Sequence, residues 1–302
     1  IVHGAGSLAG DRPLLFANCN VNSPLRFDAR MLDGILGYGA AGQAIIITPF
    51  LLMGAMAPVS TPAALVQQTL EALAGIALVQ LVRPGTPCVM GSFLSSTDMK
   101  TGSPAFGGPE SAFGLYASGQ IARDLGLPWR SGGGTLTSSQ LPDYQAGYEA
   151  MNTLLSAFLA GANVCWQSAG WMEGGLVTCF EKFAADAEVL DLLCAQFRKV
   201  EIAEEDLAFD AHVEAGHGGH FFGTQHTLER FRDCFWRPTV ASTENNDRWT
   251  KGGSLDHAQR AARRWQEQLE QYEQPPLDAA VEAELVEFVQ RRAAENGDEV
   301  AL

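Results

Sequence analysis

Five segments decide the fold, and in each of them a short apolar run ends in amides, small residues or aromatics: Ala17-Asn18-Cys19-Asn20-Val21-Asn22-Ser23, Thr48-Pro49-Phe50, Gly91-Ser92-Phe93, Gly132-Gly133-Gly134 and Gln167-Ser168-Ala169-Gly170-Trp171. Each apolar run has the length and composition of a buried β-strand. The pattern predicts strands near 14–21, 44–48, 87–93, 128–133 and 162–167. Charged residues are nearly absent from these strand ends, which is where α/β enzymes keep their binding groups.

Helical patterns fill the intervals between these strands, near 28–41, 61–82, 109–126, 143–160 and 181–197. Two helix starts are marked by a proline in the first turn, in Ser60-Thr61-Pro62 and in Gly108-Pro109-Glu110. Strands that alternate with helices predict an α/β fold with a parallel sheet. A strand-to-strand spacing of about 30 to 45 residues fits barrel units and doubly wound units alike.

The number of βα units bears on the domain organisation. Five units are fewer than the eight of a closed (β/α)8 barrel. The chain begins at Ile1 and not at Met, so we expect a truncated piece with about three units upstream. We assign 1–200 to the βα barrel portion. We assign 201–302 to a C-terminal extension of the same domain, with helices at 203–215, 254–272 and 278–293.

Charge and cysteine content exclude several classes of partner. The net charge is −15, and most of the acidic residues follow residue 170. A negative surface repels phosphate backbones, so we expect no nucleic-acid partner. No apolar run has the roughly 18 to 20 uninterrupted residues of a membrane span, and we expect no membrane partner. The six cysteines form no CxxC pair, which is typical of reduced thiols in a cytoplasmic protein.

Four groups of residues each have a functional and a structural interpretation. Gly132, Gly133 and Gly134 suit the close approach of a flat cofactor, a phosphate or a simple bend. His217, His220 and His226 are suited to a metal site, although the histidines lack the spacing of a known zinc motif. Asp98 and Glu173 are acids near strand ends that can act in catalysis or cap turns. The aromatics near the strand ends, Phe50, Phe93, Trp129, Trp166 and Trp171, can pack the core or form a cage for a quaternary ammonium.

Several linked blocks, in one order along the chain, resemble the trimethylamine methyltransferase family. They are Asn20-Val21-Asn22-Ser23-Pro24-Leu25, Thr48-Pro49-Phe50-Leu51-Leu52-Met53-Gly54-Ala55, Gly132-Gly133-Gly134, Ala169-Gly170-Trp171 with Gly174-Gly175-Leu176, and Gly218-Gly219-His220-Phe221 with His226-Thr227-Leu228. The resemblance implies a (β/α)8 TIM-type barrel that transfers a methyl group from a methylated amine to the cobalt of a separate corrinoid protein. The sequence contains no pyrrolysine, and this resembles the branch associated with quaternary amines such as glycine betaine.

The expected chemistry agrees with the strand-end residues. A quaternary amine that loses a methyl group leaves as a neutral tertiary amine, so no general acid is required. The protein then has to hold a cation and orient the methyl group. The sequence departs from the betaine-type pattern at Gln167, where those members carry His, and at His217, which stands where we expect Pro. Gln167 can donate a hydrogen bond to a carboxylate but cannot become cationic.

We therefore predict a corrinoid-protein-dependent methyltransferase acting on a quaternary or N-methylated amine. Its expected partners are the corrinoid protein, a small quaternary amine and further copies of itself, and we expect no bound metal of its own. Two alternatives remain, a barrel lyase or aldolase using Asp98 or Glu173, and a non-catalytic quaternary-amine-binding protein. The substrate residues predicted are Asn20, Asn22, Phe50, Phe93, Gln167 and Trp171, and the corrinoid-side residues are Gly132, Gly133, Gly134 and His220.

Overall fold

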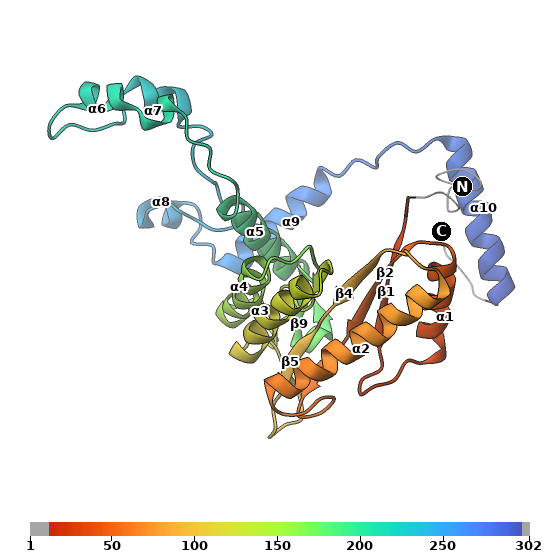
Figure 1. Ribbon diagram of the computed structural model, residues 1–302. Coiled ribbons are helices and arrows are strands. Elements are labelled where there is room, and N and C mark those ends of the chain that lie inside the picture. The colour runs from red at the N-terminus through yellow and green to blue at the C-terminus, as the bar shows by residue number, and fades with distance from the viewer. Residues whose placement is uncertain (1–11, 298–302) are drawn as a thin grey trace.

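This computed structural model describes residues 12–297. A five-stranded parallel sheet forms the centre of the fold (Figure 1). Its strands follow one another along the sheet in chain order: β1 (Phe16–Val21), β2 (Ala44–Pro49), β4 (Cys88–Gly91), β7 (Trp129–Ser131) and β8 (Val164–Cys165). All five strands predicted from the sequence are confirmed. The strand order thus runs in one direction, whereas a doubly wound sheet reverses its strand order near the middle.

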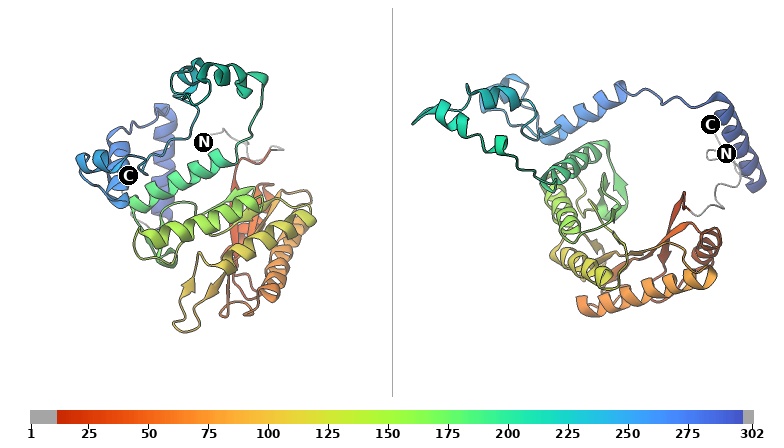
Figure 2. Two further views of the ribbon diagram at one scale, coloured as in Figure 1. Left: turned by 90° about the vertical axis from the view of Figure 1, so that its left-hand side faces the viewer. Right: turned by 45° about the horizontal axis from the view of Figure 1, so that its top comes forward.

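Five helices cover the outer face of this sheet, and each follows one strand. They are α1 (Ala29–Ala40), α2 (Thr61–Val82), α3 (Pro109–Asp124), α4 (Tyr144–Leu159) and α5 (Phe180–Gln196). Figure 2 shows the sheet as an arc with these helices outside it. The prediction of an α/β fold is confirmed. The closed (β/α)8 barrel is not found in residues 12–297, because five strands form an open arc whose edges, β1 and β8, do not pair.

Strand register separates the inner face of the arc from the helix-covered face. Asn20 of β1 lies beside Thr48 of β2, and Gly91 of β4 lies beside Arg130 of β7. Side chains alternate along a strand, so these residues point inward. Apolar neighbours such as Cys19 and Ile47 pack against α1 and α2.

The two edge strands come close together across the inner face. The ring of Phe16, at the start of β1, lies 5.8 Å from that of Trp166, which follows β8. In a flat five-stranded sheet the edge strands are about 19 Å apart, too far for two side chains to meet. The sheet is therefore strongly curved.

Short strands extend the carboxyl ends of the sheet. β3 (Leu51–Met53) pairs with β5 (Leu94–Thr97), which pairs with β6 (Pro104–Ala105), while β9 (Trp171–Met172) pairs with β10 (Val177–Thr178) around the 3-10 turn η2 (Glu173–Gly175). The sequence analysis did not anticipate these strands, since two to four residues carry too little periodicity to distinguish a strand from a loop.

The helix α2 is the one described helix that is long and apolar enough to cross a membrane by length and composition. One face of α2 packs against the sheet. Gly75 of α2 allows close contact with Ile47 of β2, and buried Glu71 accepts a hydrogen bond from Ser23 Oγ at 2.6 Å. These contacts assign that face of α2 to the protein core, while Val66, Leu70 and Leu81 are exposed.

The C-terminal part contains the turn η3 (Glu204–Leu207) and α6 (Phe209–Ala215), α7 (Gln225–Arg230), α8 (Asn246–Lys251), α9 (His257–Glu270) and α10 (Ala279–Asn296). The predicted helices at 254–272 and 278–293 are confirmed. The predicted helix at 203–215 is instead divided into η3 and α6 by Ala208, which has a left-handed φ of 49°. α9 packs on α5, with the ring of Trp265 at 4.9 Å from that of Phe180, whereas α6 and α7 stand away from the sheet (Figure 1). The assignment of 1–200 and 201–302 to one domain stays a prediction.

Candidate functional site

A chain of hydrogen-bonded polar side chains lies on the inner face at β1 and β2. Thr48 Oγ1 donates to Asn18 Oδ1 at 2.6 Å, and Asn18 Nδ2 donates to Asn20 Oδ1 at 2.7 Å. The amide nitrogen of Asn20 is thus the donor end of the chain. The predicted substrate residue Asn20 is therefore exposed at the carboxyl end of β1 and presents a donor there.

Asn22 has a different position from Asn20. Its Nδ2 donates to Asp28 Oδ2 at 3.1 Å, and its Oδ1 accepts from the Asp28 N–H at 2.7 Å. Asp28 caps α1 by accepting from the Met31 N–H at 2.8 Å. This backbone hydrogen bond, and then that from Asn22, lower the pKa of the Asp28 carboxyl. Asn22 thus shapes the loop after β1, and its contact with substrate stays a prediction.

The structure brings the predicted residues Phe50 and Phe93 together. Their ring centroids are 4.5 Å apart, and the edge of Phe106 contacts Phe93 with centroids 5.5 Å apart. Phe93 is only 6% exposed. Phe50 is half-buried, so its ring is the one that a ligand can reach. An aromatic face of this kind attracts a quaternary ammonium.

The triple glycine links the aromatic pair to the end of β8. A side chain at Gly132 would meet the Phe93 ring and the Ser92 carbonyl, at 2.6 and 2.5 Å, and one at Gly134 would meet the Gln167 carbonyl at 2.7 Å. All three glycines are buried, and Gly133 adopts a left-handed φ of 84°. These contacts require glycine for packing. They leave no open surface on that side for a corrinoid, so the cofactor role stays a prediction.

Arg130 is a candidate site residue that the sequence analysis missed. It is 2% exposed on the inner face, with its guanidinium carbon 5.1 Å from the centre of the Trp166 ring. Nη2 donates to Gln167 Oε1 at 2.8 Å and Nη1 to the Ser92 carbonyl at 3.4 Å, while Nε has no partner among the described atoms. Burial lowers the pKa of Arg130 to about 10, so it is a cation at neutral pH.

The signal for Arg130 was present in the sequence. Its neighbours Trp129 and Ser131 are a large and a small residue of one strand, and both face the helices. Alternation then turns residue 130 inward. Arg130 lies in the middle of a strand of three buried residues. Arginine is seldom fully buried, so a charge at this position indicates a functional role.

Arg130 fixes the orientation of the Gln167 amide. A guanidinium only donates hydrogen bonds, so the amide oxygen of Gln167 must face it and the NH₂ group must point elsewhere. The backbone of Gln167 is left-handed, with a φ of 53°, and its carbonyl accepts from the Thr135 N–H at 2.8 Å. The predicted substrate residue Gln167 is thus a positioned donor beside a buried positive charge.

Two other predicted site residues have different surroundings. Trp171 on β9 is 38% exposed, and its carbonyl accepts from Thr137 Oγ1 at 3.1 Å. His220 lies between α6 and α7, where its ring contacts Phe222 with centroids 5.9 Å apart. This segment stands away from the sheet (Figure 1), so the structure does not bring His220 to the strand ends.

The carboxylates of the lyase alternative are both exposed. Asp98 accepts from the Lys100 N–H at 2.9 Å and from Thr101 Oγ1 at 2.8 Å. These bonds, the first above all, lower the pKa of Asp98 and give it the role of a turn cap. Glu173 begins η2. Within residues 12–297 no group of three His, Cys, Asp or Glu side chains is arranged to hold a metal ion.

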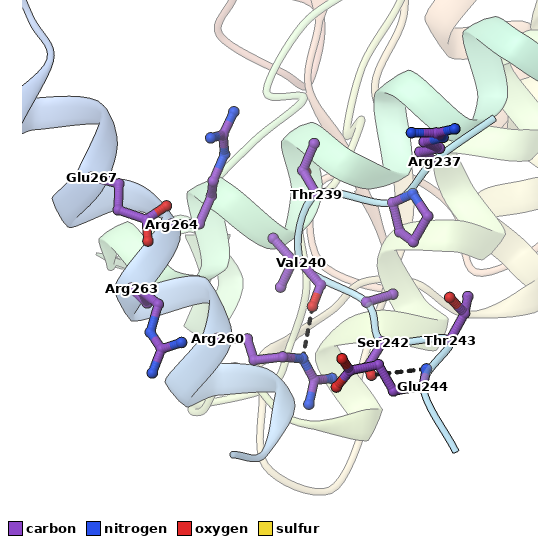
Figure 3. A pocket seen from close by; sticks show the side chains of 12 residues that line it. Arg237, Thr239, Val240, Ser242, Thr243, Glu244, Arg260, Arg263, Arg264 and Glu267 are labelled. Carbon is purple, nitrogen blue, oxygen red and sulfur yellow. Dashed lines mark hydrogen bonds between the residues drawn. The ribbon is translucent and has the colours of Figure 1, made fainter. Parts of the chain in front are cut away.

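A cavity of about 520 Å³ lies between α9 and the segment 237–244, and four arginines line it. Figure 3 shows that their guanidinium groups point in different directions. Arg260 donates to the carbonyls of Val240 and Leu255, at 2.7 and 2.6 Å. Arg263 and Arg264 extend away from it on successive positions of α9 (Figure 3). The arginines therefore do not converge on one anion.

Comparison with known proteins agrees with the resemblance found in the sequence. The chain is 38% identical over 299 residues to the glycine betaine methyltransferase of Desulfitobacterium hafniense (strain Y51), which covers 99% of this chain and 62% of that protein. It is 32% identical over 228 residues to the proline betaine:corrinoid methyltransferase of Eubacterium limosum, covering 75% of this chain and 47% of the relative. A trimethylamine methyltransferase MttB of D. hafniense (strain DSM 10664 / DCB-2) is 28% identical over 299 residues, covering 98% and 59%.

These relatives are longer than the chain, which spans 47 to 62% of their length. The family model for trimethylamine methyltransferase matches residues 1–297. The match covers almost the whole sequence, including the strand ends that carry Asn20, Phe50, Arg130 and Gln167. The chain therefore belongs to the trimethylamine methyltransferase family.

Proposed function

We propose that this chain is part of a methyltransferase that moves a methyl group from a carboxylate-bearing quaternary amine, a betaine, to a corrinoid protein. The observation that carries the proposal is the pair of Arg130 and Gln167 on the inner face. A buried cation behind a positioned amide donor suits a carboxylate. The names of two relatives, a glycine betaine methyltransferase and a proline betaine:corrinoid methyltransferase, support the same class of substrate.

Gln167 stands where betaine-type members of the family carry a histidine. A histidine at this position can carry a positive charge, and Gln167 cannot. Arg130 supplies that charge one hydrogen bond further back, at 2.8 Å from Gln167 Oε1. Carboxylate recognition therefore does not require a titrating residue at position 167.

The quaternary ammonium of a betaine requires a different kind of contact from its carboxylate. The accessible ring of Phe50 offers a π face to the quaternary ammonium, a contact worth about 0.5–2 kcal/mol. Its partner Phe93 fixes the ring from behind, and the Asn20 amide provides a further donor at the same edge of the sheet. Together these groups bind and orient the substrate, which is the protein's main contribution when the leaving group is a neutral amine.

The corrinoid supplies the nucleophile that accepts the methyl group. The chain's own residues bind the substrate and hold it in one orientation. The buried glycines at 132–134 keep Phe93 and Gln167 in place on either side of them.

We further propose that the five units are an arc of a (β/α)8 barrel. The one-directional strand order, the helices on one face and the contact of Phe16 with Trp166 support this, as does the greater length of the relatives. The six free thiols support a cytoplasmic location. A corrinoid protein as partner and assembly into a homo-oligomer complete the proposal.

The test is methyl transfer by the full-length protein with chemically reduced cobalamin or a purified corrinoid protein. Glycine betaine, proline betaine, choline and trimethylamine are offered singly, and the visible spectrum of the corrinoid is followed. We expect methylation with a betaine and none with choline. Methylation by choline or trimethylamine alone would contradict the proposed substrate class. Binding of a betaine without transfer to either acceptor would favour the non-catalytic alternative.

A further inference from the structure

A buried ion pair on α5 lies directly beneath the strand ends and has no part in the proposed function. Lys182 Nζ lies 2.5 Å from Asp186 Oδ2, and the two side chains are 2% and 3% exposed. Burying two charges costs about as much as their attraction returns, so such a pair adds little to stability compared with apolar side chains of similar size. Its presence calls for an explanation other than stability.

Each member of the pair is bonded to a different strand-end loop. Lys182 Nζ donates to the Thr135 carbonyl at 3.2 Å, in the loop that follows β7 and the triple glycine. Asp186 Oδ2 accepts from the Gly170 N–H at 2.8 Å, in the turn that follows β8. The ion pair thus connects the two loops on either side of Gln167.

Gln167 needs this support because its backbone is strained. A left-handed φ in a residue other than glycine costs about 1–2 kcal/mol, and the φ of Gln167 is 53°. The Thr135 N–H holds the Gln167 carbonyl at 2.8 Å, and Lys182 holds the carbonyl of the same Thr135. Lys182 of α5 therefore determines the orientation of Gln167 indirectly, through Thr135.

We propose that Lys182 and Asp186 are positioning residues that hold Gln167 in the left-handed conformation in which its amide bonds to Arg130 and presents NH₂ to the substrate carboxylate. Without the pair, Thr135 and Gly170 lose their anchors on α5. Gln167 then relaxes toward an ordinary φ, and its amide oxygen leaves Arg130. The inference rests on the proposed function, since it assigns a purpose to the geometry of a substrate residue.

The test compares two ligands that share a trimethylammonium group. Glycine betaine carries a carboxylate and choline a hydroxyl in its place. Binding of each to the full-length protein is measured by calorimetry for the wild type and for the double variant Lys182→Met/Asp186→Leu, which removes both charges together. We expect the double variant to bind glycine betaine roughly ten- to hundredfold more weakly, the loss of one hydrogen bond to a charged group. Choline affinity should stay within about twofold.

A matched control comes from the same helix. Glu188 is also buried, and it accepts from the Ala241 N–H at 3.0 Å, which anchors the segment 239–241 and not a strand-end loop. Glu188→Gln should leave the ratio of the two affinities unchanged. Melting temperatures of all variants identify any that fail to fold. Should the double variant melt too low for calorimetry, Lys182→Met/Asp186→Asn is measured for the same ratio, because it also removes both charges but keeps an acceptor for the Gly170 N–H.

Each outcome decides one point. A wild type that prefers glycine betaine, with a double variant that loses the preference, supports the positioning role. A folded double variant with an unchanged ratio, or an equal loss for both ligands, overturns it and leaves the proposed function intact. A wild type that prefers choline, or that binds neither glycine betaine nor proline betaine, overturns the proposed function itself.

Discussion

Replacing Arg130 by Met removes a buried cation and leaves a side chain of comparable length. The change deletes the hydrogen bond to Gln167 Oε1 at 2.8 Å and the contact with the Trp166 ring at 5.1 Å. It also removes a charge that is costly to bury, because the side chain is only 2% exposed. These effects on stability have opposite signs, so the melting temperature should change little, whereas ligand binding should change strongly.

The size of the binding effect follows from Coulomb's law. A carboxylate bonded to Gln167 Nε2 lies roughly 6–7 Å from the guanidinium, two hydrogen-bond lengths separated by an amide. At an effective dielectric constant of about 20, two opposite charges at that distance attract by about 2–3 kcal/mol. Arg130→Met should therefore weaken glycine betaine binding by about 30- to 150-fold.

Choline provides the internal control for this prediction. It carries the same trimethylammonium group without a carboxylate, and Arg130 repels it. Calorimetry on the variant should find choline affinity unchanged or improved while glycine betaine affinity falls. An equal loss for both ligands would mean that Arg130 only maintains the shape of the site. Unchanged glycine betaine affinity in a folded variant would refute the reasoning outright.

Other residues yield three further expectations. Glycine betaine affinity of the wild type should be constant between about pH 6 and 9, since Arg130 remains charged until the pH rises through its pKa of about 10; a titration curve with a midpoint near neutrality would be inconsistent with this. Gly134→Ala should lower the free energy of unfolding in urea by about 2 kcal/mol or more, because the new Cβ would lie 2.7 Å from the backbone carbonyls of Trp166 and Gln167. Its control is Gly147→Ala, at a position with open space around the new Cβ. The Asp28 carboxyl has a lowered pKa in the fold, so its stabilising effect is present above the unfolded value of about 3.8 and is lost as the pH falls through the folded value; Asp28→Asn should therefore show a smaller drop in melting temperature between about pH 6 and 3 than the wild type, and an equal drop would refute the assignment.

The long elements were predictable from sequence because their physical signals are strong. The helix 61–82 agrees residue for residue with α2, since Ser60 and Pro62 mark its start and Arg83 ends its apolar pattern. The five strands follow from apolar runs that end in glycine, asparagine or proline. By contrast, β6 and β9 have two residues each, and their pairing depends on tertiary contacts that no local pattern encodes.

The site was only partly predictable. Phe50 and Phe93 meet because parallel strands end at one edge of the sheet, which the order of motifs already indicated. The role of Gln167 depends on Arg130 one strand away, and strand register sets that relation. His220 was predicted on the corrinoid side of the site, but the segment that carries it stands away from the sheet (Figure 1). No sequence periodicity specifies the path of such a segment.

Methyl transfer from a betaine to a corrinoid protein is tested most directly by following labelled methyl groups. Glycine betaine with ¹³C in its N-methyl groups is incubated with the full-length protein and a reduced corrinoid protein, and nuclear magnetic resonance measures the label on the corrinoid and in the amine product. We expect equal amounts of methylated corrinoid and dimethylglycine, and a rate that falls with Arg130→Met. Label that remains entirely in glycine betaine, with active partner protein present, would contradict it.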